Sequence, residues 1–190
     1  MSRDKEKPAS GPLFRKAAGY VIDRSAILHG SVALDWSYNS TGEMAAWASC
    51  FHFAPETLVR DISTRETYAD REACPIVFLY RHALELCLKA LLLETTTLMQ
   101  AEGEEPVFPE QLLSKHDLKP LIAPLQGTFG RFNYSWSLGT CVSCSYEDLL
   151  ELVEELDRLD SGSYAFRYPV TKSFKSPSLP RHLRFDLFEF

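Results

Sequence analysis

The chain has 190 residues, of which 45% are hydrophobic, so it can form one domain with a substantial core. No apolar run approaches the roughly 18 residues of a membrane span, and no apolar stretch follows the charged first residues, so we expect neither a membrane helix nor a secretory signal. The formal net charge of −6 argues against a surface coated for nucleic acid, although it allows a local basic site.

The first part of the chain contains one clear helix signal. Residues 1–12 are charged and rich in proline, so we expect a flexible lead-in. A helix is predicted from Ser40, which opens a capping-box pattern and is followed by apolar residues at helical spacing. We expect Pro55 to break or kink this helix. A second capping-box pattern predicts that the next helix begins at Ser63.

The segment 75–94 is predicted to be the central helix of the fold. Residues 76–93 are apolar on almost every face, and their length and their alanine and leucine content favour a helix over a strand. A helix in a soluble protein that is apolar all round must be surrounded by other elements. Pro75 suits the first turn of this helix or a kink within a longer one.

The second half of the chain is predicted to hold two more helices. A short one is expected from His116 to about Leu125, followed by a long connection over 127–144 that is rich in glycine, serine and aromatic residues. The last helix, over 145–160, has an apolar stripe on one face and acidic residues on the other. The prolines after residue 163 indicate an extended C-terminal segment.

A row of charges occupies one face of the predicted central helix. Arg81, Glu85 and Lys89 share that face, because each step of four residues advances only about 40° around the axis. Charges taken out of water cost several kcal/mol each unless they are paired. Two interpretations remain open: a salt-bridged polar layer that fixes helix register, and a functional site or polar dimer interface. Further candidates for this cluster are His82, His116, Arg167 and Tyr168.

Three pieces of the sequence together resemble the HEPN superfamily of helical domains. They are residues 78–89, the Lys-His-Asp-Leu sequence at 115–118 followed by Leu121, and the acidic last helix with Phe-Arg-Tyr-Pro at 166–169. The resemblance covers residues 66–169 and implies an up-and-down bundle of about four or five helices, often dimeric. It also implies either a metal-independent ribonuclease of a bacterial defence system or a protein that binds RNA, nucleotides or protein partners without catalysis.

Active members of this superfamily carry an arginine and a histidine a few residues apart, usually on a late helix. The arginine can hold a phosphate, and the histidine can move a proton during attack by the RNA 2′-hydroxyl. The match to this spacing is Arg24 with His29, which lies before the first clear helix, and residues 145–160 contain no histidine. Arg81 and His82 are adjacent and project about 100° apart, so only two chains across a dimer axis could combine them. The sequence therefore leaves open whether the chain is an enzyme.

The C-terminal segment is basic and aromatic. Residues 161–185 hold five basic residues and no acidic one, interleaved with tyrosine and phenylalanine. Charge neutralisation and aromatic stacking are how proteins hold single-stranded RNA without reading its sequence. The alternative is a segment that docks its aromatic residues on the bundle and balances the acidic helix beside it. The RNA-binding candidates are Arg167, Tyr168, Lys172, Lys175, Arg181 and Arg184.

The five scattered cysteines, in a chain without a signal, are typical of a reducing compartment and predict a cytoplasmic protein. Cys141 and Cys144 have the spacing of half a zinc site, but a second pair is missing. We therefore interpret them as ordinary loop thiols and expect no metal and no cofactor.

The sequence as a whole predicts a mainly α-helical protein. We expect a single HEPN-like helical domain over 13–169, followed by an extended basic and aromatic tail over 170–190 that packs on the domain or on a protein partner. The expected assembly is a homodimer. The first functional hypothesis is a protein of a bacterial defence or toxin–antitoxin system that acts on or binds RNA. The alternatives are a non-catalytic interaction module and a nucleotide-binding domain without catalysis.

Overall fold

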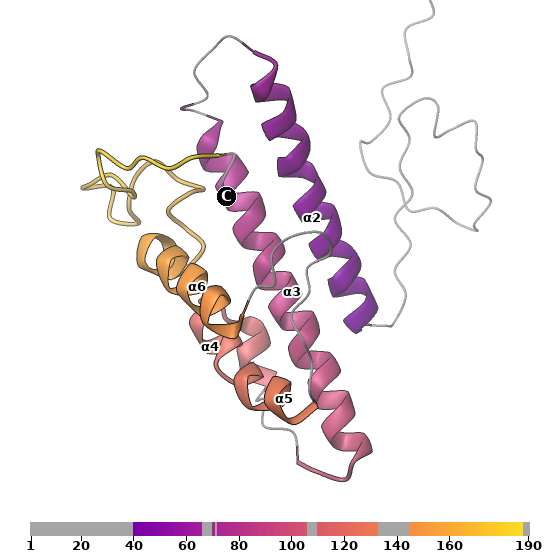
Figure 1. Cartoon of the computed structure of the whole chain (residues 1–190). Coiled ribbons are helices and arrows are strands. Elements are labelled where there is room, and N and C mark those ends of the chain that lie inside the picture. The colour runs from indigo at the N-terminus through magenta and orange to yellow at the C-terminus, as the bar shows by residue number, and fades with distance from the viewer. Residues whose placement is uncertain (1–39, 66–69, 71, 106–109, 133–144, 188–190) are drawn as a thin grey trace, which may run out of the picture. The chain divides into compact units, whose positions relative to one another are not determined.

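The protein folds as a bundle of α-helices. The computed structural model describes residues 40–65, 70, 72–105, 110–132 and 145–187, and all of them lie within one compact unit, Ser37–Phe190. This part of the chain holds five α-helices, one 3-10 helix and no β-strand, which confirms the predicted mainly α-helical bundle. The elements are α2 (Ser40–Ser63), α3 (Ala73–Ala101), η1 (Glu110–Ser114), α4 (Lys119–Ile122), α5 (Leu125–Phe132) and α6 (Tyr146–Asp160) (Figure 1).

Helix α2 begins at Ser40 as predicted but does not break at Pro55. Proline removes one backbone hydrogen bond from a helix interior. The Pro55 ring is fully buried, and the burial of this apolar ring offsets the missing bond. The second capping-box prediction is wrong, because Ser63 is the last residue of α2 and its hydroxyl donates a hydrogen bond back to the Arg60 carbonyl oxygen (2.7 Å).

Helix α3 is the central element, as its apolar character predicts. It has 29 residues, with Pro75 in its first turn. It contacts α2, α4 and α5, and α4 in turn contacts α6. Figure 1 shows α2 and α3 side by side in opposite directions, with α4, α5 and α6 on the other side of α3. None of the helices in the described segments is long and apolar enough to cross a membrane.

The core forms between α3, the α4–α5 region, α6 and the C-terminal segment. Its buried members are Val77, Leu88, Leu92, Leu118, Leu121, Ile122, Leu125, Val153, Leu156 and Phe166. The predicted helix from His116 begins later, at Lys119, and a second helix, α5, continues to Phe132. The prediction of a long connection is therefore wrong for 127–132, while 133–144 lie outside the described residues. Arg131 of α5 forms an ion pair with Glu102 (2.8 Å) just beyond the end of α3.

Helix α6, which the sequence predicts over 145–160, begins with a capping box in which Ser145 and Asp148 bond to each other. The Ser145 hydroxyl accepts a hydrogen bond from the Asp148 backbone N–H (3.1 Å), and the Asp148 carboxylate accepts one from the Ser145 N–H (2.7 Å). These two bonds satisfy backbone donors that would otherwise be free at the helix start. Val153 and Leu156 of the apolar stripe are buried, so this stripe faces the core, as expected.

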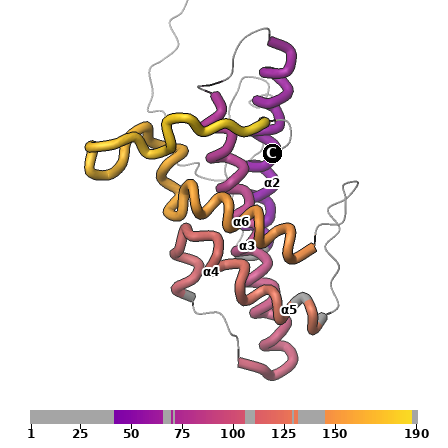
Figure 2. Tube along the Cα trace, turned by 60° about the vertical axis from the view of Figure 1, so that its left-hand side comes forward, coloured from indigo at the N-terminus to yellow at the C-terminus, as the bar shows by residue number. Residues whose placement is uncertain are grey.

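The C-terminal segment is irregular and packs on the bundle. Beyond Ser163 the chain forms turns and bends, with one isolated bridge between Val170 and Pro177 in place of a continuous extended run. Ala165 and Phe166 are buried, and the leucines at 179, 183 and 187 pack against the core. Figure 2 shows this segment leaving α6, looping outward and returning to the start of α3.

Candidate functional site

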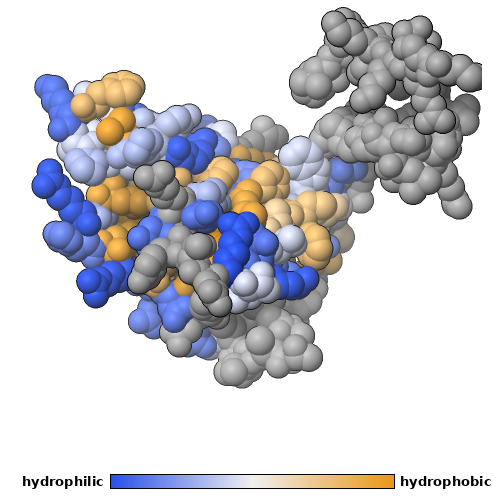
Figure 3. All heavy atoms as spheres, turned by 90° about the horizontal axis from the view of Figure 1, so that it is seen from above, coloured by the Kyte–Doolittle hydropathy of each residue, from blue (hydrophilic) through white to orange (hydrophobic). Residues whose placement is uncertain are grey.

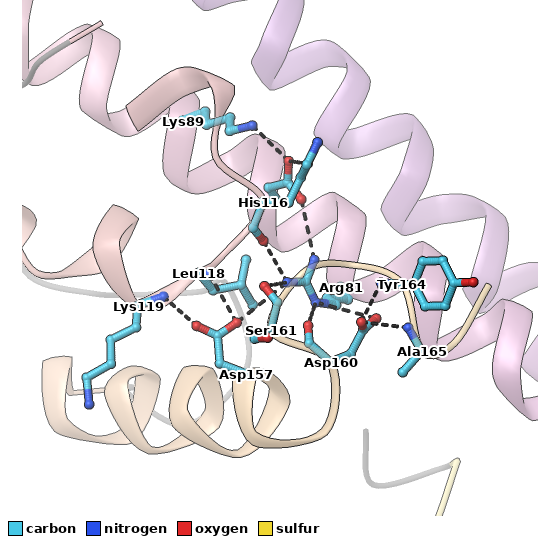
Figure 4. Close-up of polar contacts among 11 residues, drawn as sticks. Arg81, Lys89, His116, Leu118, Lys119, Asp157, Asp160, Ser161, Tyr164 and Ala165 are labelled. Carbon is cyan, nitrogen blue, oxygen red and sulfur yellow. Dashed lines mark hydrogen bonds and ion pairs between the residues drawn. The ribbon is translucent and has the colours of Figure 1, made fainter. Parts of the chain in front are cut away.

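Arg81 lies at the centre of a buried polar network. Its side chain is 0% exposed. Its Nε donates a hydrogen bond to the Asp160 carbonyl oxygen (3.0 Å), and its Nη2 donates to the carbonyl oxygens of His116 (2.7 Å) and Ser161 (3.4 Å). Its Nη1 donates to Glu85 Oε2 (3.4 Å). The guanidinium therefore joins α3 to the segment before α4 and to the C-terminal end of α6 (Figure 4).

Two acidic residues of α6 complete the surroundings of Arg81. Asp157 Oδ1 lies 3.5 Å from Arg81 Nη2, and Asp160 Oδ2 lies 3.9 Å from Arg81 Nε. Asp160 Oδ1 accepts hydrogen bonds from the backbone N–H groups of Tyr164 and Ala165, the latter at 2.7 Å. Asp160 thus fixes the first residues of the C-terminal segment beside α6.

The sequence interpretation missed Asp157 and Asp160, because it assigned the acidic residues of this helix to a solvent-exposed face. A signal was present in their spacing. Asp157 is four residues after Val153, and Asp160 is four residues after Leu156, so both lie on or beside the buried stripe. An acidic residue in register with an apolar stripe indicates a buried cationic partner.

Glu85 connects two further groups of the predicted cluster. Its Oε1 accepts a hydrogen bond from Lys89 Nζ (2.8 Å) and lies 3.0 Å from His116 Nδ1. Burial by itself raises the pKa of Glu85, but the hydrogen bonds and positive charges of Lys89 and His116 outweigh it and hold the pKa below its ordinary value. Glu85 is therefore a carboxylate at neutral pH. Because a carboxylate only accepts hydrogen bonds, Nδ1 is the protonated nitrogen of the His116 ring.

His82 lies in an aromatic cluster. Its ring is stacked on Phe78 (5.9 Å between centroids, 8° between planes) and meets Phe51 edge to face (4.5 Å, 88°). Burial is the main cause that lowers the pKa of His82; Glu85 opposes it, and the nearby positive charges lower the pKa further. A neutral ring suits this apolar position between α2 and α3.

Arg167 joins the same aromatic cluster. Its guanidinium carbon lies 5.5 Å from the centroid of the Phe78 ring and 5.8 Å from that of Tyr168, which is the geometry of cation–π contacts. Phe78 therefore contacts both Arg167 and His82. The structure thus joins four of the seven predicted cluster residues (Arg81, Glu85, Lys89 and His116) through hydrogen bonds. His82 and Arg167 both contact Phe78, and Tyr168 contacts Arg167.

The RNA-binding candidates form an exposed basic and aromatic surface, here called the tail surface. Its members are the six candidates Arg167, Tyr168, Lys172, Lys175, Arg181 and Arg184, together with Tyr164 and Phe174. All of these except the half-buried Tyr164 are exposed. The rings of Tyr164 and Tyr168 stack at 4.6 Å between centroids, and Lys172 Nζ lies 5.4 Å from the centroid of Tyr164. Cations therefore lie beside the stacked aromatic rings at the start of this surface.

Several sequence candidates lie outside the described residues. They are Arg24, His29, Cys141 and Cys144. Among the residues that the structure does describe, no group of three or more histidine, cysteine, aspartate or glutamate side chains could hold a metal ion.

Comparisons of the chain with protein-family models, with curated proteins and with solved structures found no match. Two features of the described residues bear on function: the buried network around Arg81, whose member His116 has an exposed ring, and the tail surface.

Proposed function

We propose that the protein binds single-stranded RNA through the tail surface, as a HEPN-like helical protein of a bacterial defence or toxin–antitoxin system. The observation that carries this proposal is the contact of the exposed cations Arg167 and Lys172 with two stacked tyrosines. Backbone phosphates are bound by lysine and arginine, and bases stack on aromatic rings, so both parts of a single strand find partners here.

The exposure of the aromatic rings supports this proposal. Tyr168 is 48% exposed and Phe174 is 80% exposed. Large aromatic side chains with this much free surface can accept a nucleobase, and one stacked base contributes about 1–3 kcal/mol to binding. Seen from the end of the bundle where this segment lies, hydrophobic residues are interspersed with hydrophilic ones (Figure 3).

The buried network gives this surface a fixed support. Arg81 binds the carbonyl groups at the end of α6, and Asp160 binds the backbone N–H groups of Tyr164 and Ala165. The beginning of the tail surface is therefore anchored to the central helix. A surface held in this way loses less conformational entropy when it binds a ligand.

A second candidate function is a non-catalytic interaction module, with a second copy of the chain as the expected partner. The observation that favours it is the exposure of large apolar side chains on α2, where Phe53 is 62% exposed and Trp47 and Leu58 are also exposed. Large exposed apolar side chains such as Phe53 can be covered when two copies of a chain associate.

RNA binding can be tested by fluorescence anisotropy with a labelled single-stranded RNA of mixed sequence, over a series of salt concentrations. We expect RNA affinity to fall as the salt concentration rises. The slope of the logarithm of the binding constant against the logarithm of the salt concentration should become shallower by about 0.7 for each phosphate contact removed, as in Lys172→Ala or Arg181→Ala. Tyr168→Ala should weaken binding by about 1–3 kcal/mol at all salt concentrations.

The matched controls lie on α2. Arg60→Ala removes an exposed cation and Phe53→Ala an exposed aromatic ring, both outside the tail surface. Neither should change RNA affinity. Binding that is insensitive to salt, or that the control variants weaken as much as the tail variants, would contradict the proposal. A concentration-dependent dimer that Phe53→Ala dissociates would support the second candidate.

A further inference from the structure

One turn of the C-terminal segment displays an aromatic ring that the fold itself does not use. Phe174 has a φ of 57°, in the left-handed region that residues with a side chain seldom adopt. Its side chain is 80% exposed, more than any other large hydrophobic side chain among the described residues. A glycine would satisfy such a turn without exposing an apolar ring. Strained backbone at an exposed residue is characteristic of binding sites, so Phe174 points to a contact outside its own chain.

The turn over residues 170–177, here called the tip, has a fixed shape. The Thr171 N–H donates a hydrogen bond to the Ser176 carbonyl oxygen (2.9 Å), and the Phe174 N–H donates one to the Thr171 carbonyl oxygen (2.8 Å). Figure 2 shows this part of the chain projecting outward from the helices. The ring is flanked in the sequence by two exposed basic residues, Lys172 and Lys175. The tip therefore presents an apolar ring between two positive charges.

The outer face of α6 is complementary to the tip. Leu152 is 40% exposed. Glu155 follows Leu152 by three residues and Asp148 precedes it by four, so both carboxylates adjoin it on the helix surface. Glu151 adds a further exposed acid. These four residues, here called the acidic face, present an apolar side chain bordered by negative charge.

Within one chain, no ion pair among the described residues joins the tip to the acidic face. The ion pairs that α6 makes there reach only Lys119 and Arg81, and none involves a carboxylate of the acidic face. The two lysines of the tip form no ion pair with a described residue either. The charges of both surfaces are therefore available to another molecule.

We propose that the tip of one chain docks on the acidic face of a second copy. In this contact the Phe174 ring packs on Leu152, and the lysines of the tip pair with the glutamates of the acidic face. Charge complementarity identifies the occupant, because each surface combines an apolar centre with charges opposite to those of the other. Every chain carries both surfaces, so a two-fold symmetric pair makes the contact twice. The contact is separate from the side chains exposed on α2, and it does not depend on RNA binding.

The test follows the mass of the full-length protein by analytical ultracentrifugation as its concentration is raised, at low salt, because salt screens such charge contacts. We expect a dimer whose fraction grows with concentration. Phe174→Ala should raise the dissociation constant of the dimer about tenfold or more, since a central aromatic side chain carries much of the binding energy of an interface. Two double charge reversals should each give a monomer: Lys172→Glu with Lys175→Glu on the tip, and Glu151→Lys with Glu155→Lys on the acidic face.

The decisive measurement mixes these two charge-reversed proteins. One has a negative tip with its acidic face unchanged, and the other has a positive tip with a positive charge where the acidic face was. Neither protein can therefore pair with itself. In an equimolar mixture each tip meets a surface of opposite charge, so we expect the dimer to reappear, which would also show that both variants are folded.

Lys115→Glu and Glu94→Lys are the matched controls, because they reverse exposed charges outside both surfaces. They should leave the dimer intact. A wild type that stays monomeric at every concentration would overturn the inference, and so would a mixture that stays monomeric although circular dichroism shows both variants to be folded. A dimer that Phe53→Ala dissociates and the tip variants do not would also overturn it, because the interface would then lie on α2.

Discussion

Arg81 is bonded through each of its three nitrogens inside the protein. The donors Nε, Nη1 and Nη2 reach three backbone carbonyl groups and the Glu85 carboxylate. Two of these carbonyls belong to the C-terminal end of α6, where unsatisfied carbonyl groups carry partial negative charge. A lysine could not replace this side chain, since it presents a single point charge and not a planar fork of donors.

Replacing Arg81 with alanine should destabilise the protein by about 3–5 kcal/mol, because buried carboxylates and carbonyls would lose their cationic partner. Urea denaturation at neutral pH measures this change. Arg158→Ala is the control, since Arg158 is an exposed arginine on α6, and surface substitutions of this kind change stability by about 0.5 kcal/mol or less. Equal effects of the two variants would show that the buried network does not stabilise the fold.

His82 should make stability depend on pH in the mildly acidic range. Its folded-state pKa lies below the ordinary value of 6.5, so the unfolded chain takes up a proton more readily than the folded one. The free energy of unfolding should therefore decrease as pH falls below the ordinary value and towards the folded-state pKa. In His82→Phe, which keeps an aromatic ring, the loss of stability between about pH 7.5 and about pH 5.5 should be smaller. Parallel urea titrations of the wild type and His82→Phe at the two pH values measure these losses of stability. An equal loss in both proteins would contradict the expectation.

At the scale of the elements, Asp157 provides the connection between α6 and α4. Its Oδ1 accepts a hydrogen bond from the Leu118 N–H (3.1 Å) and its Oδ2 from the Lys119 N–H (2.8 Å). Free N–H groups at a helix start are commonly satisfied by a side chain from the residue just before the helix. Here the side chain comes from another helix, so a very short helix is fixed in place by a longer one.

Asp157→Ala should lower the free energy of unfolding by about 1–2 kcal/mol, because two backbone N–H donors lose their acceptor. This is the upper part of the range for the loss of a helix N-terminal cap. Native-state hydrogen exchange should show faster exchange of the Leu118 and Lys119 amides. The nearby exposed Glu155 offers the comparison, and Glu155→Ala should leave both amides protected. Unchanged exchange in Asp157→Ala would count against the capping role.

The sequence predicted those helices whose local residue pattern agrees with their surroundings in the folded protein. Helix α3 follows from its uniform apolar character, and the start of α6 follows from the Ser145 capping box. The late start of α4 could not be predicted, because it depends on Asp157 from a distant part of the chain. The continuation of α2 through Pro55 depends likewise on burial of the ring, which a local pattern does not reveal.

The candidate site was predictable in part for the same reason. The shared face of Arg81, Glu85 and Lys89 follows from helix geometry, and the hydrogen bonds to Glu85 agree with it. The approach of His116 to this face depends on how the chain returns after α3, so it could be only a guess from the sequence. A spacing within one helix specifies a face, but not which distant segment covers it.

For the whole molecule, the C-terminal segment is part of the fold. Phe166 is a buried member of the core, and the chain beyond it returns to the start of α3 (Figure 2). We expect Phe166→Ala to destabilise the protein by about 3–5 kcal/mol. The exposed Phe174 provides the matched control, and Phe174→Ala should change stability by about 0.5 kcal/mol or less. Thermal or urea unfolding of the two variants measures the difference, and equal stabilities would mean that the segment is not part of the core.

The partners of Arg81 also have a consequence for the protein as it leaves the ribosome. The His116 carbonyl lies 35 residues after Arg81 and the Asp160 carbonyl 79 residues after it, so a nascent chain that ends at α3 has neither. Chains are synthesised from the N-terminus at about 5–20 residues per second, which leaves the charged face of α3 in water for several seconds. The face of α3 that carries Arg81 therefore cannot reach its final packing before the segment that ends α6 has been made.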